Sequence, residues 1–226
     1  MPPIPPSQPL SSPPLRYGLH FQDLEHRGTD IFLNAFGPNP RHLLQRCVDF
    51  VVHTLYDEIP LEFQPKVETI TLILRPMPGG LAHTCGSEKH KEIHFSLDYI
   101  QSLSPAIASA EMEGVIVHEV VHCFQYNAHG TCPGGLIEGI ADFVRLRANL
   151  APPHWSKITN GNWDAGYEKT GYFLDWIENR QSNAIGLSFV KDLNLAMKDC
   201  KFDASVFQDL TGSPLNKLWK LYSKDV

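Results

Sequence analysis

Residues 114–146, GVIVHEVVHCFQYNAHGTCPGGLIEGIADFVRL, decide the expected fold because they read as helix, loop and helix. Apolar residues recur at helical spacing over 108–126 and again over 135–150, and we expect a helix over each range. Gly130 and Pro133 interrupt this pattern, as is typical of a turn. A connection this short returns the second helix alongside the first, so polar groups on the two helices can meet.

His118 and His122 are four residues apart in the first of these helices, so both imidazoles project from one face. That spacing lets two ring nitrogens reach a single tetrahedral zinc ion, and Glu119 beside them can act on water as a general base. The apolar flanks 114–117 and 120–121 predict a buried helix. An apolar environment that excludes solvent strengthens the electrostatic effect of a metal ion on the water bound to it. The alternative interpretation is two core histidines and a surface glutamate.

A catalytic zinc site needs a third protein ligand, and the second helix carries two acids one turn apart, Glu138 and Asp142. We predict Glu138 as the ligand and Asp142 as the acceptor of a hydrogen bond that orients a ligand histidine. The reverse assignment stays open, and so does a structural role for both acids near a helix N-terminus. His129 is a weaker candidate, because the longer zinc motif requires glycine and histidine where this chain has Gln125 and Ala128.

The rest of the chain predicts an α+β domain: a small sheet with one helix, then a helical half, and a cleft where they meet. Residues 40–57 have helical periodicity, whereas 67–74 (VETITLIL) and 92–97 (EIHFSL) have the pattern of strands. The apolar stretch 31–33 fits either a strand or a short helix. Further helices are expected over 166–178, 188–197, 203–210 and 214–222.

Composition limits the classes of function. A chain of 226 residues with 42% hydrophobic content can form one domain with a sizeable core. A net charge of -6 and the lack of a basic run argue against nucleic acid or a membrane surface as partner. Residues 1–14 are expected to be a disordered, proline-rich leader, followed by a domain over 15–226. Because the leader lacks an apolar core typical of secretory signals, a cytoplasmic location is expected on the chain as given.

The five cysteines are an odd number without a C-x-x-C pair. Reduced and mostly buried thiols are therefore expected. A bridge between Cys123 and Cys132 is the alternative, and a closed structural metal site using these two thiols would leave Glu119 without a role.

Two long runs resemble one family: HEVVHCFQYNAHGTCPGGLIEGIADFVRLRANLAPPHW, which starts at His118, and WDAGYEKTGYFLDWIE, which starts at Trp163. Both are similar to the plant basic secretory protein family and its fungal and bacterial relatives, which are zincin-type peptidases. Shorter similarities at GGLAHTCG, EIHFSLDYI and the ending LWKLY extend the resemblance over residues 15–223.

The resemblance implies a zincin-like fold: a small twisted, mainly antiparallel sheet, an active-site helix under it, and a mostly helical C-terminal half. It also implies zinc as cofactor, with His118, His122 and Glu138 as ligands and Glu119 as general base. The family is named for basic, secreted plant proteins, whereas this chain is acidic and has no secretory signal. Secretion is therefore the alternative location.

The expected reaction is zinc-assisted hydrolysis of a peptide bond in a peptide or protein substrate. Glu119 would take a proton from water and deliver it to the leaving amine, and Tyr167 is the candidate donor to the oxyanion. An extended substrate could pair with residues 79–84, although the glycines there also fit a turn.

Hydrolysis of another amide or ester in a biosynthetic reaction, or binding without catalysis, are the alternative functions. Other candidates for the oxyanion donor are Tyr172, His154 and Arg145, and the aromatic candidates could instead simply pack against neighbouring helices.

Overall fold

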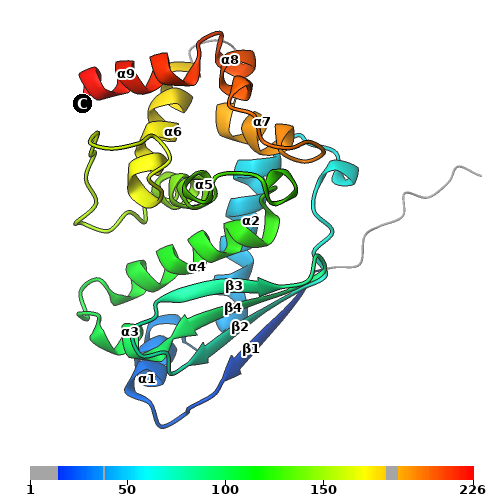
Figure 1. Cartoon of the computed structure of the whole chain (residues 1–226). Coiled ribbons are helices and arrows are strands. Elements are labelled where there is room, and N and C mark those ends of the chain that lie inside the picture. Colours follow the sequence, from blue (N-terminus) through cyan, green and yellow to red (C-terminus); the bar gives the residue numbers. More distant parts are fainter. Residues whose placement is uncertain (1–14, 38, 182–187) are drawn as a thin grey trace, which may run out of the picture.

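A computed structural model describes residues 15–37, 39–181 and 188–226, so the expected leader over 1–14 lies outside the described residues. Figure 1 shows a half built around a sheet and a helical half. The sheet half contains β1 (Arg16–Phe21), α1 (Arg27–Phe36), α2 (Pro40–Tyr56), β2 (Thr69–Arg75), β3 (Ala82–Gly86), β4 (His90–Ser96), α3 (Leu97–Ser102) and α4 (Ala108–Phe124). The helical half contains α5 (Gly134–Arg147), α6 (Tyr167–Gln181), α7 (Phe189–Ala196), α8 (Ser205–Thr211) and α9 (Leu215–Asp225). Short 3-10 turns lie at Leu61–Phe63 and Ala128–Gly130.

The sheet has the strand order β1-β2-β4-β3. β2 pairs in parallel with both β1 and β4, whereas β3 pairs antiparallel with β4. The expectation of a mainly antiparallel sheet is therefore wrong, and the sheet is mixed. β1 was not predicted from the sequence. Parallel neighbours need a long crossover, and α1 and α2 form that crossover between β1 and β2.

Side chains alternate between the two faces of the sheet. In β2, Ile70, Leu72 and Leu74 are fully buried, while Thr69 and Thr71 on the other face are half-buried. Helices α2 and α4 cover the buried face (Figure 1). The opposite face carries mostly half-buried and exposed side chains, with Ile73 and Ser96 as buried exceptions, and we call it the open face.

Helix α4 lies between the sheet and α5, and it is buried on nearly all sides (Figure 1). Two glycines permit close contact between the helices around it. A Cβ at Gly114 of α4 would lie 2.6 Å from Nε of Arg145 on α5. A Cβ at Gly139 of α5 would lie 2.3 Å from Cγ2 of Thr170 on α6. The three helices therefore stack closely, and α4 is held in the boundary between the two halves.

The expected helices and the two expected strands are found within a few residues of their predicted bounds. Two short helices that the sequence did not indicate clearly are stabilised at their N-termini. Ser96 accepts a hydrogen bond from the backbone of Tyr99 at the start of α3, and His26 accepts one from Gly28 at the start of α1.

The cysteines are free, with Cys47 and Cys123 buried, so the alternative bridge between Cys123 and Cys132 is not formed.

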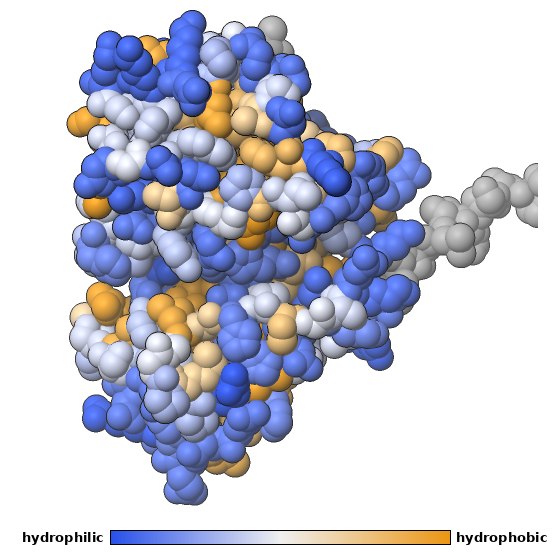
Figure 2. Space-filling view, in the orientation of Figure 1, coloured by the Kyte–Doolittle hydropathy of each residue, from blue (hydrophilic) through white to orange (hydrophobic). Residues whose placement is uncertain are grey.

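Within the described ranges, none of the helices is both long and apolar enough to span a membrane. The visible surface is mainly hydrophilic, and hydrophobic residues gather mostly over the helical half and in the band where the two halves meet (Figure 2).

Candidate functional site

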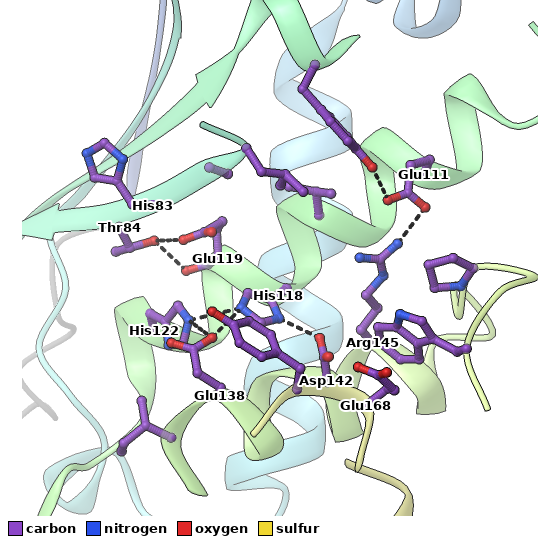
Figure 3. A pocket seen from close by; sticks show the side chains of 18 of the residues that line it. His83, Thr84, Glu111, His118, Glu119, His122, Glu138, Asp142, Arg145 and Glu168 are labelled. Atoms are coloured by element: carbon purple, nitrogen blue, oxygen red, sulfur yellow. Dashed lines mark hydrogen bonds and ion pairs between the residues drawn. The ribbon is translucent and has the colours of Figure 1, made fainter. Parts of the chain in front are cut away.

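Polar side chains from α4 and α5 meet in the boundary between the two halves of the protein. His118 and His122 lie on one face of α4, and Glu138 and Asp142 lie one turn apart on the facing side of α5 (Figure 3). The loop between the helices contains Gly130 and returns the chain, as the spacing predicts. All four predicted residues are therefore brought together.

Each imidazole has one nitrogen committed to a hydrogen-bond acceptor. Nδ1 of His118 lies 2.6 Å from a carboxylate oxygen of Asp142, which is 2% exposed. Nδ1 of His122 contacts Oε1 of Gln125, and the amide group of Gln125 donates to the carbonyl of Ile137 at 3.0 Å. Because the Gln125 amide nitrogen is fixed by that carbonyl, its oxygen faces His122. Both Nδ1 atoms are then protonated donors, so each Nε2 atom carries a lone pair whenever its ring is neutral.

Three acceptor atoms consequently converge on one point. Nε2 of His118 lies 3.2 Å from Nε2 of His122 and 3.1 Å from Oε2 of Glu138. Nε2 of His122 lies 3.7 Å from the same Glu138 oxygen. Ligands at about 2.0–2.2 Å from one tetrahedral zinc ion would be about 3.3–3.6 Å apart. The three distances lie within about 0.2 Å of this range. Lone pairs that face each other need a cation between them, either a proton or a metal ion.

The same electrostatics appear in the pKa values of the metal-free groups. Burial alone would lower the pKa of His118, but its hydrogen bonds to Asp142 and Glu138 outweigh burial and raise that pKa to about 9. Burial would raise the pKa of Glu138, but hydrogen bonds from His118 and His122 hold it well below its usual range. A proton on His118 and a metal ion therefore compete for the same position.

Glu119 lies beside this cluster and is held by strand β3. The Thr84 hydroxyl lies 2.7 Å from Oε2 and 2.9 Å from the backbone oxygen of Glu119 (Figure 3). The Glu119 side chain is inside a cleft, and the residue is only 4% exposed. Among the described residues we find no hydrogen bond to its second carboxylate oxygen, which is therefore available to a substrate or to water.

The cleft has a volume of about 680 Å³ and lies between β3 and α4 on one side and α5 and the start of α6 on the other. Tyr167, the first residue of α6, lines it and stacks on His118, with ring centroids 6.3 Å apart and an interplanar angle of 10°. Its φ of 47° is unusual for a residue with a side chain. The negative charge of Glu138, with burial and two further carboxylates, raises the pKa of the Tyr167 phenol. The phenol therefore stays protonated and can donate a hydrogen bond.

A buried ion pair closes one end of the cleft. Arg145 donates to Glu111 at 2.7 Å and to the carbonyl of Leu150 at 3.0 Å, and its guanidinium lies 5.1 Å from the centre of the Trp155 ring. The Tyr99 hydroxyl donates to the other oxygen of Glu111 at 2.7 Å. These contacts use Nε and Nη2 of Arg145 for structure, so the side chain is less available to a substrate than the sequence suggested.

Of the other predicted candidates, His154 lines the cleft. Tyr172 instead packs against Trp155 and does not line it. His129 lies in the loop after α4 with a φ of 56° and does not belong to the cluster. Thr84 was predicted only as part of an extended segment, and Gln125 only as a departure from the longer zinc motif. The position of Gln125, three residues after His122 at the end of the helix, was the sequence signal that could have indicated its contact with His122.

A family model described as "Peptidase of plants and bacteria" (BSP) matches residues 15–222. The curated proteins contain no match to this chain, and neither do the solved structures. The matched range includes all of α4, α5, β3 and Tyr167, which build the cleft. Because the match covers nearly the whole chain, this protein belongs to the BSP family of peptidases of plants and bacteria.

Proposed function

We propose that this protein is a zinc-dependent metallopeptidase with His118, His122 and Glu138 as metal ligands and Glu119 as general base. The single observation that carries the proposal is the convergence on one point of three possible ligand atoms, at 3.1, 3.2 and 3.7 Å from one another. Both imidazoles reach this point because Asp142 and Gln125 hold their other nitrogens. Membership of a peptidase family supports the cleavage of peptide bonds as the reaction.

The donor set suits zinc. Two imidazole nitrogens and one carboxylate oxygen are the ligands of many catalytic zinc sites, in which a fourth position stays open. When bound, zinc would polarise a substrate carbonyl and lower the pKa of water to about 7. Asp142 would fix the tautomer of His118 and make its ring a better ligand, and Gln125 would do the same for His122.

Glu119 is the proposed general base and then general acid. Thr84 holds one oxygen of its carboxylate, which leaves the other to accept a proton from the attacking water. The same carboxylate would deliver that proton to the leaving amine. Because the site is buried, these charges interact more strongly than they would in water.

Tyr167 is the proposed donor to the oxyanion. Its ring lies over His118 at the mouth of the cleft, and its phenol keeps its proton because its pKa is raised. Tyr167 also has a left-handed backbone conformation, which costs about 1–2 kcal/mol for a residue other than glycine. Strain of this kind concentrates at functional sites, which supports a role in catalysis.

The proposed substrate is an extended peptide or a protein segment. β3 is at the edge of the sheet and lines the cleft with Ala82 and Thr84, so a substrate strand can add to its unpaired side. The glycines Gly79 and Gly80 lie in the turn before β3, so this pairing would use β3 itself.

The test combines metal analysis with a peptide-library assay. The wild type is expected to contain one zinc ion in the cleft and to cleave peptides. Glu119→Gln should retain that zinc and lose cleavage, whereas Glu138→Ala should lose most of the zinc. A metal-free protein that still cleaves peptides would refute the proposal. Zinc in the cleft without cleavage of any peptide would instead favour another amide or ester as substrate, or binding alone.

A further inference from the structure

A second group of metal-binding side chains lies on the open face of the sheet. In the antiparallel pair of β3 and β4, His83 is directly opposite His94 and Cys85 is directly opposite Glu92. Residues two apart in a strand share a face, so these four side chains form a square. Thr84, between two of them, points to Glu119 in the cleft, and Figure 3 shows His83 and Thr84 on opposite sides of β3.

The possible ligand atoms are already close together. One atom each from His83, Cys85 and His94 lies within 4.8 Å of the others. A zinc ion with bonds of about 2.0–2.3 Å would bring such atoms to about 3.3–3.8 Å from one another. The two histidine rings are stacked, with centroids 4.8 Å apart and an interplanar angle of 7°. His83 and Cys85 are exposed, so small rotations of these side chains can close the remaining gap.

The backbone holds the ligands in place before a metal arrives. β3 and β4 form a hairpin with a turn of only three residues, 87–89, and β4 is in turn paired with β2. The ligands therefore come from two strands whose register is fixed, and ordering them costs little entropy. Two imidazoles and a thiolate suit a metal ion of intermediate softness such as zinc.

We propose that His83, Cys85 and His94 bind one divalent transition-metal ion of the zinc type on the open face of the sheet. Glu92 is outside the group of ligand atoms that lie within 4.8 Å of one another, so its exposed side chain would rotate to become the fourth ligand. Its Oε2 lies 3.3 Å from Nε2 of His94, so its carboxylate is beside the site. Binding releases the thiol proton of Cys85 to solvent, because the thiolate is the ligand.

Arg75 opposes this binding. Its Nε donates to Nδ1 of His94 at 3.1 Å, which leaves the ring proton of His94 on Nε2, where it faces Glu92. Coordination through Nε2 requires that this proton move to Nδ1 and that Arg75 turn away. The positive charge of Arg75 also repels a cation. Arg75→Gln is therefore expected to bind the metal more tightly.

The ion would tie the edge strand β3 to β4. Thr84 lies between two of the proposed ligands and holds Glu119, so the second site and the cleft share one strand. The proposed second site does not depend on the metal or the reaction proposed for the cleft.

Cobalt(II) is the probe, because a thiolate ligand gives a charge-transfer absorption that two imidazoles and a carboxylate do not give. The full chain is freed of metal with a chelator and titrated with cobalt. We expect this absorption to appear and to account for one ion per chain in addition to the ion proposed for the cleft. Cys85→Ser should abolish it, whereas Cys200→Ser, at another exposed cysteine, should leave it unchanged. Replacing His83 or His94 with alanine should weaken cobalt binding at least about tenfold, since outer partners of a metal ligand already account for about 10–100-fold.

Two further variants separate the two sites. Glu138→Ala should retain the thiolate absorption while it loses the ion of the cleft, and Arg75→Gln should shift the titration to lower cobalt concentration. The proposal is overturned if saturating cobalt gives no thiolate absorption, or if Cys85→Ser keeps it. It is also overturned if Cys200→Ser removes it, because a different thiol would then be the ligand.

Discussion

Replacing Asp142 with asparagine would remove one negative charge from the proposed metal centre and keep nearly the same side-chain shape. In the wild type, its carboxylate accepts a hydrogen bond of 2.6 Å from Nδ1 of His118 and is almost completely buried. The amide oxygen of asparagine can still accept that hydrogen bond, so His118 would keep its orientation. The ring would, however, be a weaker ligand, because no adjacent negative charge stabilises it when it binds a cation.

The size of the effect follows from the change in that hydrogen bond. A hydrogen bond to a charged group contributes about 1.5–3 kcal/mol and one between neutral groups about 0.5–1.5 kcal/mol. The difference is about 1–1.5 kcal/mol, and about 1.4 kcal/mol corresponds to a factor of ten in a dissociation constant. Asp142→Asn should therefore weaken zinc binding about tenfold. Glu138→Gln replaces a charged ligand oxygen with a neutral amide oxygen at the proposed metal itself and should weaken binding much more.

The assay is competition for zinc between the protein and a chromogenic chelator, measured at one pH for both variants and the wild type. Cys85→Ser in every chain removes the proposed second site from the measurement. Equal losses in Asp142→Asn and Glu138→Gln would contradict the division of roles between the two acids. A greater loss in Asp142→Asn would reverse it and make Asp142 the ligand.

Four further outcomes are expected. Thr84→Val removes the hydroxyl that holds Glu119, the proposed general base, so kcat should fall about 10–100-fold with zinc content unchanged, since a bond to a charged group contributes about 1.5–3 kcal/mol. Tyr167→Phe should lower kcat about 100-fold in steady-state kinetics with little change in KM, as expected for a donor that acts in the transition state. Gly139→Ala places a Cβ 2.3 Å from Thr170, and thermal unfolding should show a loss of about 1–3 kcal/mol, while Gly134→Ala, with nothing within 4 Å, serves as its control. Chelation should lower the midpoint of thermal unfolding, because a ligand at about 100 times its dissociation constant stabilises the native state by about 2.7 kcal/mol; an unchanged midpoint would contradict a bound ion.

The helices of the candidate site were predictable because their sequence signals are local. Spacing within one helix put His118 and His122 on one face, and spacing within the next put Glu138 and Asp142 on one face. The loop with Gly130 indicated that the two faces could meet. Which acid reaches Nε2 of His118 and which reaches Nδ1 depends on the angle and position at which α5 crosses α4. No local sequence pattern contains that information.

The sheet was predicted less well, because its missing strands carry weak patterns. β3 has the sequence AHTCG and is exposed along one edge, so it lacks the apolar alternation of a half-buried strand. β1 contains Gly18, which lies close to Thr71 of β2, and glycine lowers the tendency to form a strand. Without β1 the parallel crossover could not be recognised. The contact of Thr84 with Glu119 is long-range and depends on the position of β3.

The loop before Tyr167 packs directly against the main chain of α5 at Gly135. A Cβ at Gly135 would lie 1.8 Å from the backbone oxygen of Asp164, so the loop is seated against a bare stretch of main chain. The position of the loop therefore depends on the absence of a side chain at position 135. A methyl group there would push away the main chain that leads into Tyr167, and with it the ring that stacks on His118.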